Sequence, residues 1–341
     1  MSVSILNKLL EDFRAGREMA PEFVKPVLDA LITEEDESIL RNVFVAWERK
    51  GIEENEIYGF AKIMRERMKR VNATHETFVD IVGTGGSKAK TFNVSTAASF
   101  VVAGAGVPVA KHGNKAATSN SGSADVLSEL GIDPAIDAAT AERCLNEIGI
   151  CFMFAPNYHR LSPTLGKVRR GLGFPTIFNC VGPLCNPASA PHQLIGVWDV
   201  KLLPKIANAL KRLGTHRSWV VHGRSGLDEI SLHGSTTVAE VTGDGVRIFE
   251  LSPFSFGLGE SSHGDIRSVD SAHSACMIRN VLLGKPHDQG AENIVVINAA
   301  AALFVSAAAG SLTEGVALAR QSLQDGSAHR KLEELASAVP A

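Results

Sequence analysis

From Ile5 to about Arg70, hydrophobic residues recur with the spacing of amphipathic helices. Apolar side chains fall on one face in three successive stretches, Ile5–Phe13, Phe23–Leu31 and Ile39–Trp47. Thr33, which acidic residues follow, is the expected start of the third helix because carboxylates suit a first helical turn. The polar stretch Val71–Thr77 ends this region, so the pattern predicts a small helical domain over residues 1–72.

Beyond residue 76, short apolar runs alternate with helical segments. Runs typical of strands covered on both faces occur at 78–82, 107–110, 150–154, 194–197 and 218–221. Two further runs, 236–241 and 246–251, flank a Thr-Gly-Asp-Gly sequence, which predicts a hairpin with a type I′ turn. Helices are expected at 97–106, in two pieces within 130–148, and at 271–283, 292–309, 312–323 and 328–338.

These patterns predict an α/β fold with a small N-terminal helical domain and a larger domain over residues 76–335. The larger domain should contain a mixed, mostly parallel sheet covered by helices. Some helices near 165–190 could pack on the helical domain instead.

Composition narrows the classes of partner. Of the 341 residues, 45% are hydrophobic and 21% charged, as in ordinary soluble proteins. The formal net charge of −3 gives no reason to expect nucleic-acid binding, because a protein that binds nucleic acid normally has a clustered basic face. The most apolar run, 294–309, is shorter than the ~20 residues that a bilayer requires. The five cysteines include no CxxC pair, so no zinc site is expected, and their odd number fits reduced thiols in a cytoplasmic protein. No membrane partner is expected either.

The segment 78–130 contains most of the candidate chemistry. Its first apolar run ends at Gly83-Thr84-Gly85-Gly86, where the lack of side chains lets backbone N–H groups approach an anion closely. The helix expected over 97–106, which follows Asn93-Val94-Ser95-Thr96, would point the free N–H groups of its first turn back toward the same loop. Hydrogen bonds to charged groups contribute roughly 1.5–3 kcal/mol each, so the two features together predict a phosphate site.

A second polar loop follows the next predicted strand. The run 107–110 leads into Lys111-His112-Gly113-Asn114 and then into the polar stretch 115–123. Parallel strands that end in polar, glycine-bearing loops form a crevice at the carboxyl edge of a sheet. A lone glycine motif would be only a strand-to-helix turn, whereas the two loops together indicate one site.

The motifs GTGG, TFNVST, KHGN and SGSAD, in this order and spacing, resemble those of the anthranilate phosphoribosyltransferase family. This family belongs to the nucleoside phosphorylase-like phosphoribosyltransferases, or glycosyltransferase family 3. The resemblance extends from near the N-terminus to about Gly326. It implies a pentosyltransferase that moves the phosphoribosyl group of 5-phosphoribosyl 1-pyrophosphate to anthranilate and releases pyrophosphate, in tryptophan biosynthesis. It also implies Mg²⁺ as cofactor and a homodimer formed through the N-terminal helices.

The resemblance also implies which residues bind the substrates. Contacts to phosphoribosyl pyrophosphate would come from Gly83, Gly86, Ser87, Thr91, Asn93, Val94, Ser95, Thr96, Lys111, His112, Gly113, Asn114, Lys115, Ala116, Ala117, Thr118, Ser119 and Ser123. Anthranilate would contact Gly83, His112, Asn114, His159 and Arg169. Arg169 would face its carboxylate, which a guanidinium binds in bidentate fashion. His112 and His159 are candidates to orient the amine. No general base is named, because an aromatic amine is already unprotonated near neutrality.

Two adjacent carboxylates, Asp228 and Glu229, follow the predicted strand 218–221. Carboxylate oxygens suit a Mg²⁺ ion that bridges phosphate oxygens, and the resemblance implies Ser95, Asp228 and Glu229 as its ligands. Three positions depart from the family pattern. Ser87 replaces an aspartate after GTGG, Lys115 replaces an arginine, and Arg160 replaces the proline of an HP dipeptide. Ser87 keeps a hydrogen-bond donor for phosphate but removes a carboxylate from the site.

Two alternative functions stay open. A pyrimidine nucleoside phosphorylase-like enzyme would share the architecture and glycine loop, but it does not explain Arg169 or the segment GPLCNPA. A non-catalytic, nucleic-acid-binding paralogue of the same fold is the other. Ser87 favours that paralogue, while the acidic net charge and the retained pair Asp228 and Glu229 oppose it. A dinucleotide-binding enzyme is disfavoured because no G-x-G-x-x-G opens the loop.

Overall fold

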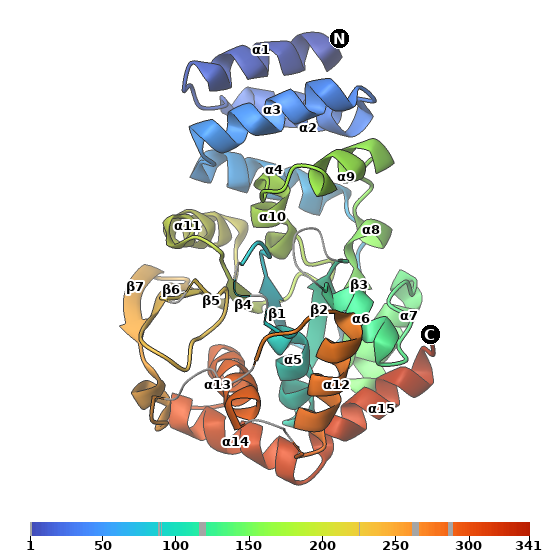
Figure 1. Cartoon of the computed structure of the whole chain (residues 1–341), viewed down its shortest axis with the longest axis vertical. Coiled ribbons are helices and arrows are strands. Elements are labelled where there is room, and N and C mark those ends of the chain that lie inside the picture. The colour runs from blue at the N-terminus through green and yellow to red at the C-terminus, as the bar shows by residue number, and fades with distance from the viewer. Residues whose placement is uncertain are drawn as a thin grey trace.

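The computed structural model describes residues 2–87, 89, 91–115, 121–224, 226–260, 266–285 and 289–341. The chain begins with the helices α1 (Ser2–Arg14), α2 (Val24–Thr33), α3 (Glu37–Lys50) and α4 (Glu54–Arg67), which lie at one end of the molecule (Figure 1). The prediction that the third helix starts at Thr33 was wrong. Thr33 ends α2, and α3 starts after Asp36, whose carboxylate accepts hydrogen bonds from the N–H groups of Ser38 and Ile39.

The strands form one sheet of seven in the described part of the chain, in the order β3-β2-β1-β4-β5-β6-β7. They are β1 (Val79–Gly83), β2 (Val109–Gly113), β3 (Ile150–Phe154), β4 (His192–Gly196), β5 (Arg217–Gly223), β6 (Thr236–Thr242) and β7 (Gly245–Leu251). The strands β1 to β5 pair in parallel, and β6 and β7 add to the edge in antiparallel fashion. The predicted α/β fold with a mixed, mostly parallel sheet is therefore confirmed.

The hairpin between β6 and β7 has the predicted place but not the predicted turn. Gly243 and Asp244 connect the strands, since Thr242 pairs with Gly245. A type I′ turn needs a positive φ at both connecting residues, and neither has one. The positive φ instead falls on Gly245, at 155°. The positive φ therefore lies at Gly245, the residue after the two connecting residues, and not at Gly243 or Asp244.

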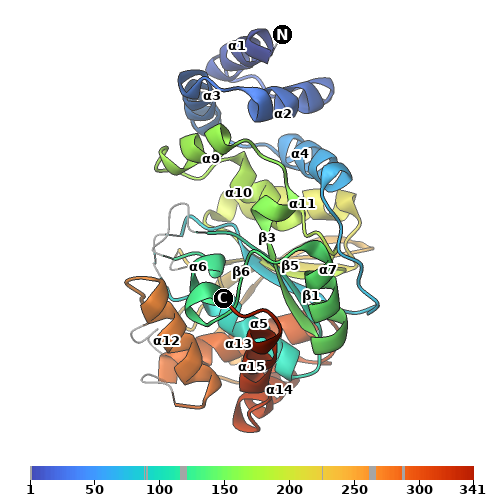
Figure 2. The same ribbon diagram turned by 90° about the vertical axis from the view of Figure 1, so that its right-hand side faces the viewer.

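Helices cover both faces of the sheet. The helices of the α/β region are α5 (Val94–Gly104), α6 (Ser123–Glu129), α7 (Ala138–Arg143), α8 (Ala155–Tyr158), α9 (Pro163–Arg170), α10 (Ile177–Val181), α11 (Leu203–Leu213), α12 (Ser271–Leu282), α13 (Gln289–Val305), α14 (Leu312–Gln324) and α15 (Ser327–Ala338). Figure 2 shows α9 and α10 between the first helices and the sheet, with α12 to α15 on the opposite side. The described helices include none that is long and apolar enough to span a bilayer.

Alternation along the strands explains this layering. Leu194 and Val221 belong to a buried cluster with α5, α13, α14 and α15, whereas their neighbours Ile195 and Val220 belong to a second buried cluster. Successive strand residues point to opposite faces, so the two clusters lie on opposite sides of the sheet. The second cluster continues through α10 and α11 into α1 to α4, with α9 packed on α3 and α10 on α4. The division of the chain into domains 1–72 and 76–335 stays a prediction.

The central strands separate where the site lies. Strand β1 pairs with β4 through Gly83, but its pairing with β2 is confined to Val79 and Val109. Side chains bridge the gap. Lys111 Nζ donates to the Ile81 carbonyl at 2.6 Å, and Asp80 accepts from the His112 N–H at 3.2 Å. The sheet therefore opens toward its carboxyl edge, as expected where the connections leave β1 in both directions.

Candidate active site

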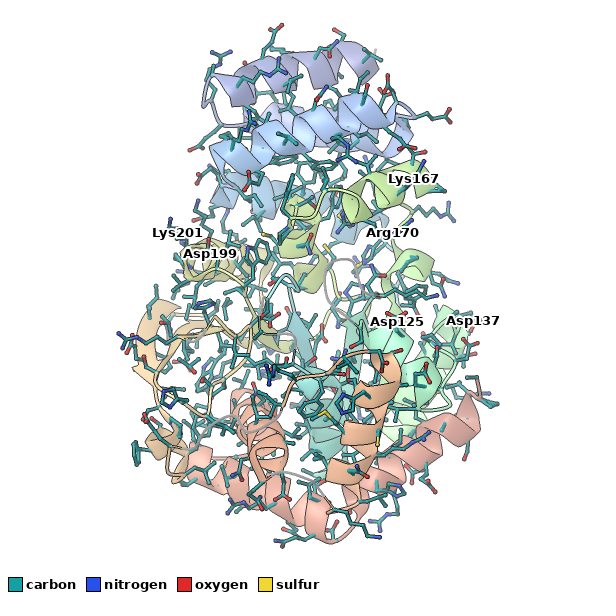
Figure 3. All side chains as sticks on the ribbon, in the orientation of Figure 1. Asp125, Asp137, Lys167, Arg170, Asp199 and Lys201 are labelled. Carbon is teal, nitrogen blue, oxygen red and sulfur yellow. The ribbon has the colours of Figure 1, made fainter. Side chains whose placement is uncertain are left out.

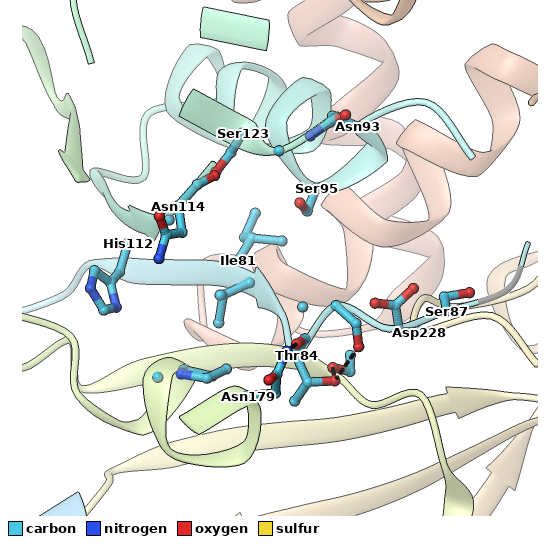
Figure 4. Close-up of a pocket in the computed structure, with 18 of the residues that line it drawn as sticks. Ile81, Thr84, Ser87, Asn93, Ser95, His112, Asn114, Ser123, Asn179 and Asp228 are labelled. Carbon is cyan, nitrogen blue, oxygen red and sulfur yellow. Dashed lines mark hydrogen bonds between the residues drawn. The ribbon is translucent and has the colours of Figure 1, made fainter. Parts of the chain in front are cut away.

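A cavity of about 260 Å³ opens at the carboxyl ends of the central strands (Figure 4). Most of the residues that the sequence predicted for a site lie on its wall. They are Gly83, Gly86, Ser87, Thr91, Asn93, Ser95, Lys111, His112, Gly113, Asn114, Lys115, Ser123, Arg169, Asp228 and Glu229. The two loops that we interpreted as one site thus meet around one cavity.

The other predicted residues lie elsewhere. Val94 and Thr96 are buried in α5 and do not line the cavity. His159 lines a second cavity beside Tyr158 and Arg160. Ala116, Ala117, Thr118 and Ser119 lie outside the described residues.

The glycines let two loops approach each other closely. A Cβ atom on Gly83 would lie 3.0 Å from Asp228 Oδ2, and one on Gly196 would lie 1.6 Å from the Asp228 carbonyl oxygen. Gly85 and Gly86 have φ values of 66° and 87°, which favour glycine. The glycine loop and the Asp228 loop therefore pack as one wall of the cavity.

The start of α5 differs from the expectation of free N–H groups. The backbone turns tightly at Asn93, with φ −74° and ψ 72°, and the Val94 N–H donates to the Phe92 carbonyl at 2.7 Å. The Thr96 N–H donates to the Asn93 carbonyl at 3.0 Å. Local turns thus satisfy these donors before a ligand arrives. The Ser95 hydroxyl, in contrast, reaches the cavity and accepts from Lys111 Nζ at 3.2 Å.

Asp228 and Glu229 form an electrostatically crowded pair. Burial raises the pKa of Asp228, and the Ser87 hydroxyl opposes this rise through a hydrogen bond. Burial and then the charge of Asp228 raise the pKa of Glu229 well above its usual value, although Lys111 and the Ser95 backbone oppose this. A second positive charge beside the pair would lower both values.

The pair is suited to a divalent cation. Glu229 Oε2 is buried and has no hydrogen-bond partner among the described residues. Oxygen ligands from two carboxylates and a hydroxyl fit Mg²⁺, which commonly completes its coordination with water and substrate phosphates. The described residues contain no group of three or more His, Cys, Asp or Glu side chains that could hold a metal ion. A cation here would therefore need oxygens beyond those of the two carboxylates, from Ser95, water or a ligand.

Lys111 places a positive charge beneath this pair. Burial lowers the pKa of Lys111 to about 8, while Asp80 and Glu229 oppose the fall. Burial also raises the pKa of Asp80 to about 6, against hydrogen bonds from Asn186 and His112. The charges of Asp80 and Lys111 thus partly compensate each other within the sheet, close to where a phosphate would bind.

Arg169 lies on the cavity wall at the end of α9. Its guanidinium lies 5.0 Å from the centre of the Phe178 ring, and its Nε has no hydrogen-bond partner among the described residues. Burial lowers its pKa to about 10, and the neighbouring Arg170 lowers it further. Lys167 and Arg170 on the same helix are exposed instead (Figure 3). A half-buried guanidinium with an unused donor is suited to bind an anion from a ligand.

His112 lines the cavity and His159 packs behind it. Their rings meet edge to face with centres 5.1 Å apart, and both Nε2 atoms lack hydrogen-bond partners among the described residues. Burial lowers the pKa of His112 well below its usual value and that of His159 to about 4. Both imidazoles are therefore neutral near pH 7.

Comparison with known proteins identifies the family. The model described as "Glycosyl transferase family, a/b domain" matches residues 75–329. Anthranilate phosphoribosyltransferase of Azorhizobium caulinodans is 46% identical over 293 residues, which cover 86% of this chain and 84% of the relative. The chain belongs to the anthranilate phosphoribosyltransferase family.

Solved structures of this family share the complete fold. The crystal structure from Thermus thermophilus matches with a TM-score of 0.87 and 35% identity, over 97% of this chain and 98% of that chain. The Saccharomyces cerevisiae protein, solved in complex with PRPP and Mg, matches with a TM-score of 0.82 and 29% identity, over 99% and 93%. Membership of the anthranilate phosphoribosyltransferase family thus rests on both sequence and fold.

The replacement of the family's aspartate by Ser87 has a visible structural consequence. Ser87 Oγ donates to the Gly226 carbonyl at 3.1 Å, and its hydroxyl also lowers the pKa of the nearby Asp228 carboxyl, against the rise caused by burial. Ser87 therefore ties the glycine loop to the loop of the carboxylate pair, beside which it lies in Figure 4. A carboxylate here would instead add a negative charge beside Asp228.

Sequence reasoning missed several polar residues that shape this anthranilate phosphoribosyltransferase site. Asp80 and Asn186 bridge the opened strands, since Asn186 Nδ2 lies 2.8 Å from both Asp80 Oδ2 and the Ala110 carbonyl. Asn298 bonds the N–H and carbonyl of Ile230, next to Glu229. Asn179 contacts the glycine loop. Three of them share one signal, a single polar residue within an apolar run: VDIV, IFNCV and VVINAA.

Proposed function

We propose that this protein transfers the phosphoribosyl group of phosphoribosyl pyrophosphate to the amino group of anthranilate. One observation carries the proposal: a single cavity holds a glycine loop and a carboxylate pair on one side and the available Arg169 guanidinium on another. The first set suits a metal-bound pyrophosphate, and the second suits an aromatic carboxylate. A pyrimidine base, the substrate of the alternative phosphorylase, has no carboxylate for Arg169 to bind.

Residues of this chain would hold the donor substrate. Lys111 and the loop Gly83–Gly86 would contact its phosphates, and Ser95, Asp228 and Glu229 would hold Mg²⁺. The metal, when bound, neutralises the leaving pyrophosphate as a Lewis acid. C1 of the ribose becomes cation-like as the pyrophosphate departs, so the task of these residues is to stabilise charge on the leaving group. The predicted contacts of Ala116 to Ser119 remain part of this proposal.

The acceptor would lie between Arg169 and His112. A bidentate pair of Arg169 with the carboxylate would fix the ring, which holds the amine in line with C1. The neutral His112 ring has a free Nε2 and can orient the amine without competing as a cation. His159 supports His112 from behind in this structure, so its expected direct contact with anthranilate would require movement of the 155–161 segment.

We also propose that the protein forms a homodimer through its N-terminal helices and works in the cytoplasm. This proposal rests on the family resemblance. Light scattering of the purified protein tests the dimer. A monomer at micromolar concentration would contradict it.

Anthranilate fluorescence tests the activity directly. Purified protein is mixed with anthranilate, phosphoribosyl pyrophosphate and Mg²⁺, with and without a chelator. We expect a loss of fluorescence that requires the metal and the pyrophosphate donor. A well-folded protein that consumes no anthranilate at high concentrations of both substrates would contradict the proposal. Nucleosides with phosphate would then test the phosphorylase alternative.

A further inference from the structure

Asn179 contacts both sides of the cavity. It lies in α10, and its Nδ2 donates to the Thr84 carbonyl of the glycine loop at 3.1 Å. Its Oδ1 accepts from the Thr176 N–H at 2.9 Å and from Arg169 Nη2 at 3.5 Å. One short side chain therefore connects the loop that would bind pyrophosphate with the arginine that would bind the aromatic acid.

The orientation of the Asn179 amide follows from its partners. Thr176 offers an N–H, which requires the carbonyl oxygen, and Thr84 offers a carbonyl, which requires the NH₂ group. A flipped amide would place like groups together at both contacts. Figure 4 shows Asn179 beside Thr84 on the cavity wall.

Capping of α10 alone does not require an asparagine. The capping box of Thr176 needs only an acceptor at position 179, which aspartate, glutamate or glutamine can also supply. The amide donor is used on Thr84, outside the helix. Thr84 in turn directs its own N–H and hydroxyl to the Gly196 carbonyl, at 2.9 and 3.0 Å. Asn179 thus supplies the contact that fixes the Thr84 carbonyl from the other side.

The contact with Arg169 is long enough to leave the guanidinium available. At 3.5 Å it orients the Nη2 group weakly, and Nε has no partner among the described residues. A ligand carboxylate could therefore replace or share this contact without breaking a strong bond. The stacking of Arg169 on Phe178, the residue before Asn179, keeps the guanidinium near the same place.

We propose that Asn179 is a positioning residue for both the aromatic-acid and the pyrophosphate subsites: its amide fixes the Thr84 carbonyl, and its oxygen orients the Arg169 guanidinium until a carboxylate binds. This inference rests on the proposed transferase function. It predicts that changes at position 179 affect the use of both substrates, although Asn179 itself binds neither.

Two substitutions separate positioning from simple stability. Asn179→Ala removes the cap and both contacts, so we expect the KM for each substrate to rise roughly five- to tenfold. Asn179→Asp keeps the acceptor for Thr176 and hence the cap, but its carboxylate pairs with Arg169 and loses the donor to Thr84. We therefore expect Asn179→Asp to be the more stable variant and to have the higher KM for anthranilate.

Thr176→Val is the matched control. It removes the Thr176 hydroxyl, together with its long 3.4 Å contact to Asn179 Oδ1, but leaves the Thr176 N–H and both outward contacts of Asn179 in place. We expect a lower melting temperature with both KM values within about twofold of the wild type. Melting temperature and the two KM values are measured for all four proteins.

Two results would overturn the proposal. One is that both Asn179 variants keep the wild-type KM for both substrates. The other is that, across the variants, the KM for anthranilate rises in the same order as the melting temperature falls. If the wild type consumes no anthranilate, the transferase function fails first. Thermal shifts with pyrophosphate plus Mg²⁺ and with benzoate then test the two subsites directly. Loss of both shifts in Asn179→Ala, but not in Thr176→Val, would still support the positioning role, and their retention would refute it.

Discussion

At the scale of single residues, Arg169 brings to the cavity a cationic group whose Nε has no hydrogen-bond partner among the described residues. Its pKa falls to about 10 through burial, so the folded protein holds a cation in a place that disfavours one. Such a cost is offset when an anionic ligand binds. A charge-assisted pair contributes roughly 1.5–3 kcal/mol, or about a tenfold to hundredfold effect on binding.

Replacement of Arg169 should therefore affect one substrate. We expect Arg169→Ala to raise the KM for anthranilate by about tenfold to a hundredfold and the KM for phosphoribosyl pyrophosphate by less than about threefold. Arg169→Lys should be intermediate, because lysine keeps the charge but not the bidentate fork. Steady-state kinetics with each substrate varied in turn gives both values. Equal increases for the two substrates would contradict the carboxylate role.

The carboxylate pair predicts a pH dependence of metal binding. Burial raises the pKa of Asp228, and burial with the Asp228 charge raises that of Glu229 well above its usual value. Both groups thus keep protons to a higher pH than free carboxyls do, and a divalent cation must displace those protons. We expect Mg²⁺ affinity to increase with pH above the range in which free carboxyls titrate, with protons released on binding.

Calorimetry in buffers of different ionisation enthalpy measures that proton release. Asp228→Asn with Glu229→Gln is the control, because amides cannot release protons and bind Mg²⁺ poorly. An affinity that stays constant over this pH range would show that the pair is already ionised in the metal-free protein.

At the scale of elements, the site depends on how closely β4 approaches the Asp228 loop. Gly196 ends β4, and a Cβ there would lie 1.6 Å from the Asp228 carbonyl oxygen, so one of the two segments must move. We expect Gly196→Ala to displace the carboxylate pair and to weaken Mg²⁺ binding by at least about tenfold. Isothermal titration with Mg²⁺ and pyrophosphate measures this.

Gly243→Ala is the matched control for that substitution. Gly243 lies in the β6–β7 turn, has no positive φ, and has no atom within 4 Å of the position of a Cβ. We expect this variant to bind Mg²⁺ like the wild type. Similar binding by both alanine variants would mean that the Asp228 loop tolerates displacement.

The elements themselves were largely predictable, because each depends on local pattern. Apolar runs indicated the strands, and the polar stretch 71–77 falls in the connection between α4 and β1. The predicted start of α3 was wrong because the sequence pattern does not show which of several acidic residues before a helix caps it. In the structure the Asp36 carboxylate is the one that caps α3. The turn at Asn93, where the Val94 and Thr96 N–H groups find backbone partners, likewise has no signature in hydrophobic spacing.

The supporting polar residues were harder to predict because their partners are distant in sequence. Asn179 contacts Thr84 across 95 positions, and Asp80 contacts Asn186 across 106. A polar residue within an apolar run shows that some partner exists, since buried polar groups are hydrogen-bonded. It does not show which segment supplies that partner. Motif resemblance found the residues that line the cavity, but not those that hold the lining in place.

At the scale of the whole molecule, one buried hydrophobic cluster lies on each face of the sheet. Arg65 links the N-terminal helices, which belong to the second cluster, to the rim of the cavity. Arg65 lies in the last turn of α4, and its Nε donates to the Leu184 carbonyl at 2.6 Å. Its Nη1 donates to the Leu213 carbonyl at the end of α11, at 3.3 Å. Pro183, beside Leu184, lines the cavity. Arg65 thus connects α4 to the cavity wall, in addition to the packing of α4 on α10.

Replacement of Arg65 should consequently destabilise the molecule more than replacement of a neighbouring surface arginine. Arg65→Met leaves two partly buried carbonyls without their donor, which costs about 1–3 kcal/mol. Arg67→Met, on the same helix, removes only an ion pair with Asp29. The Arg67 and Asp29 side chains are 38% and 43% exposed, and ion pairs this exposed contribute about 0–1 kcal/mol. Denaturant unfolding of both variants gives the comparison. We expect the midpoint to fall clearly in Arg65→Met and little in Arg67→Met, and equal shifts would mean that the helices are held to the sheet by their apolar contacts alone.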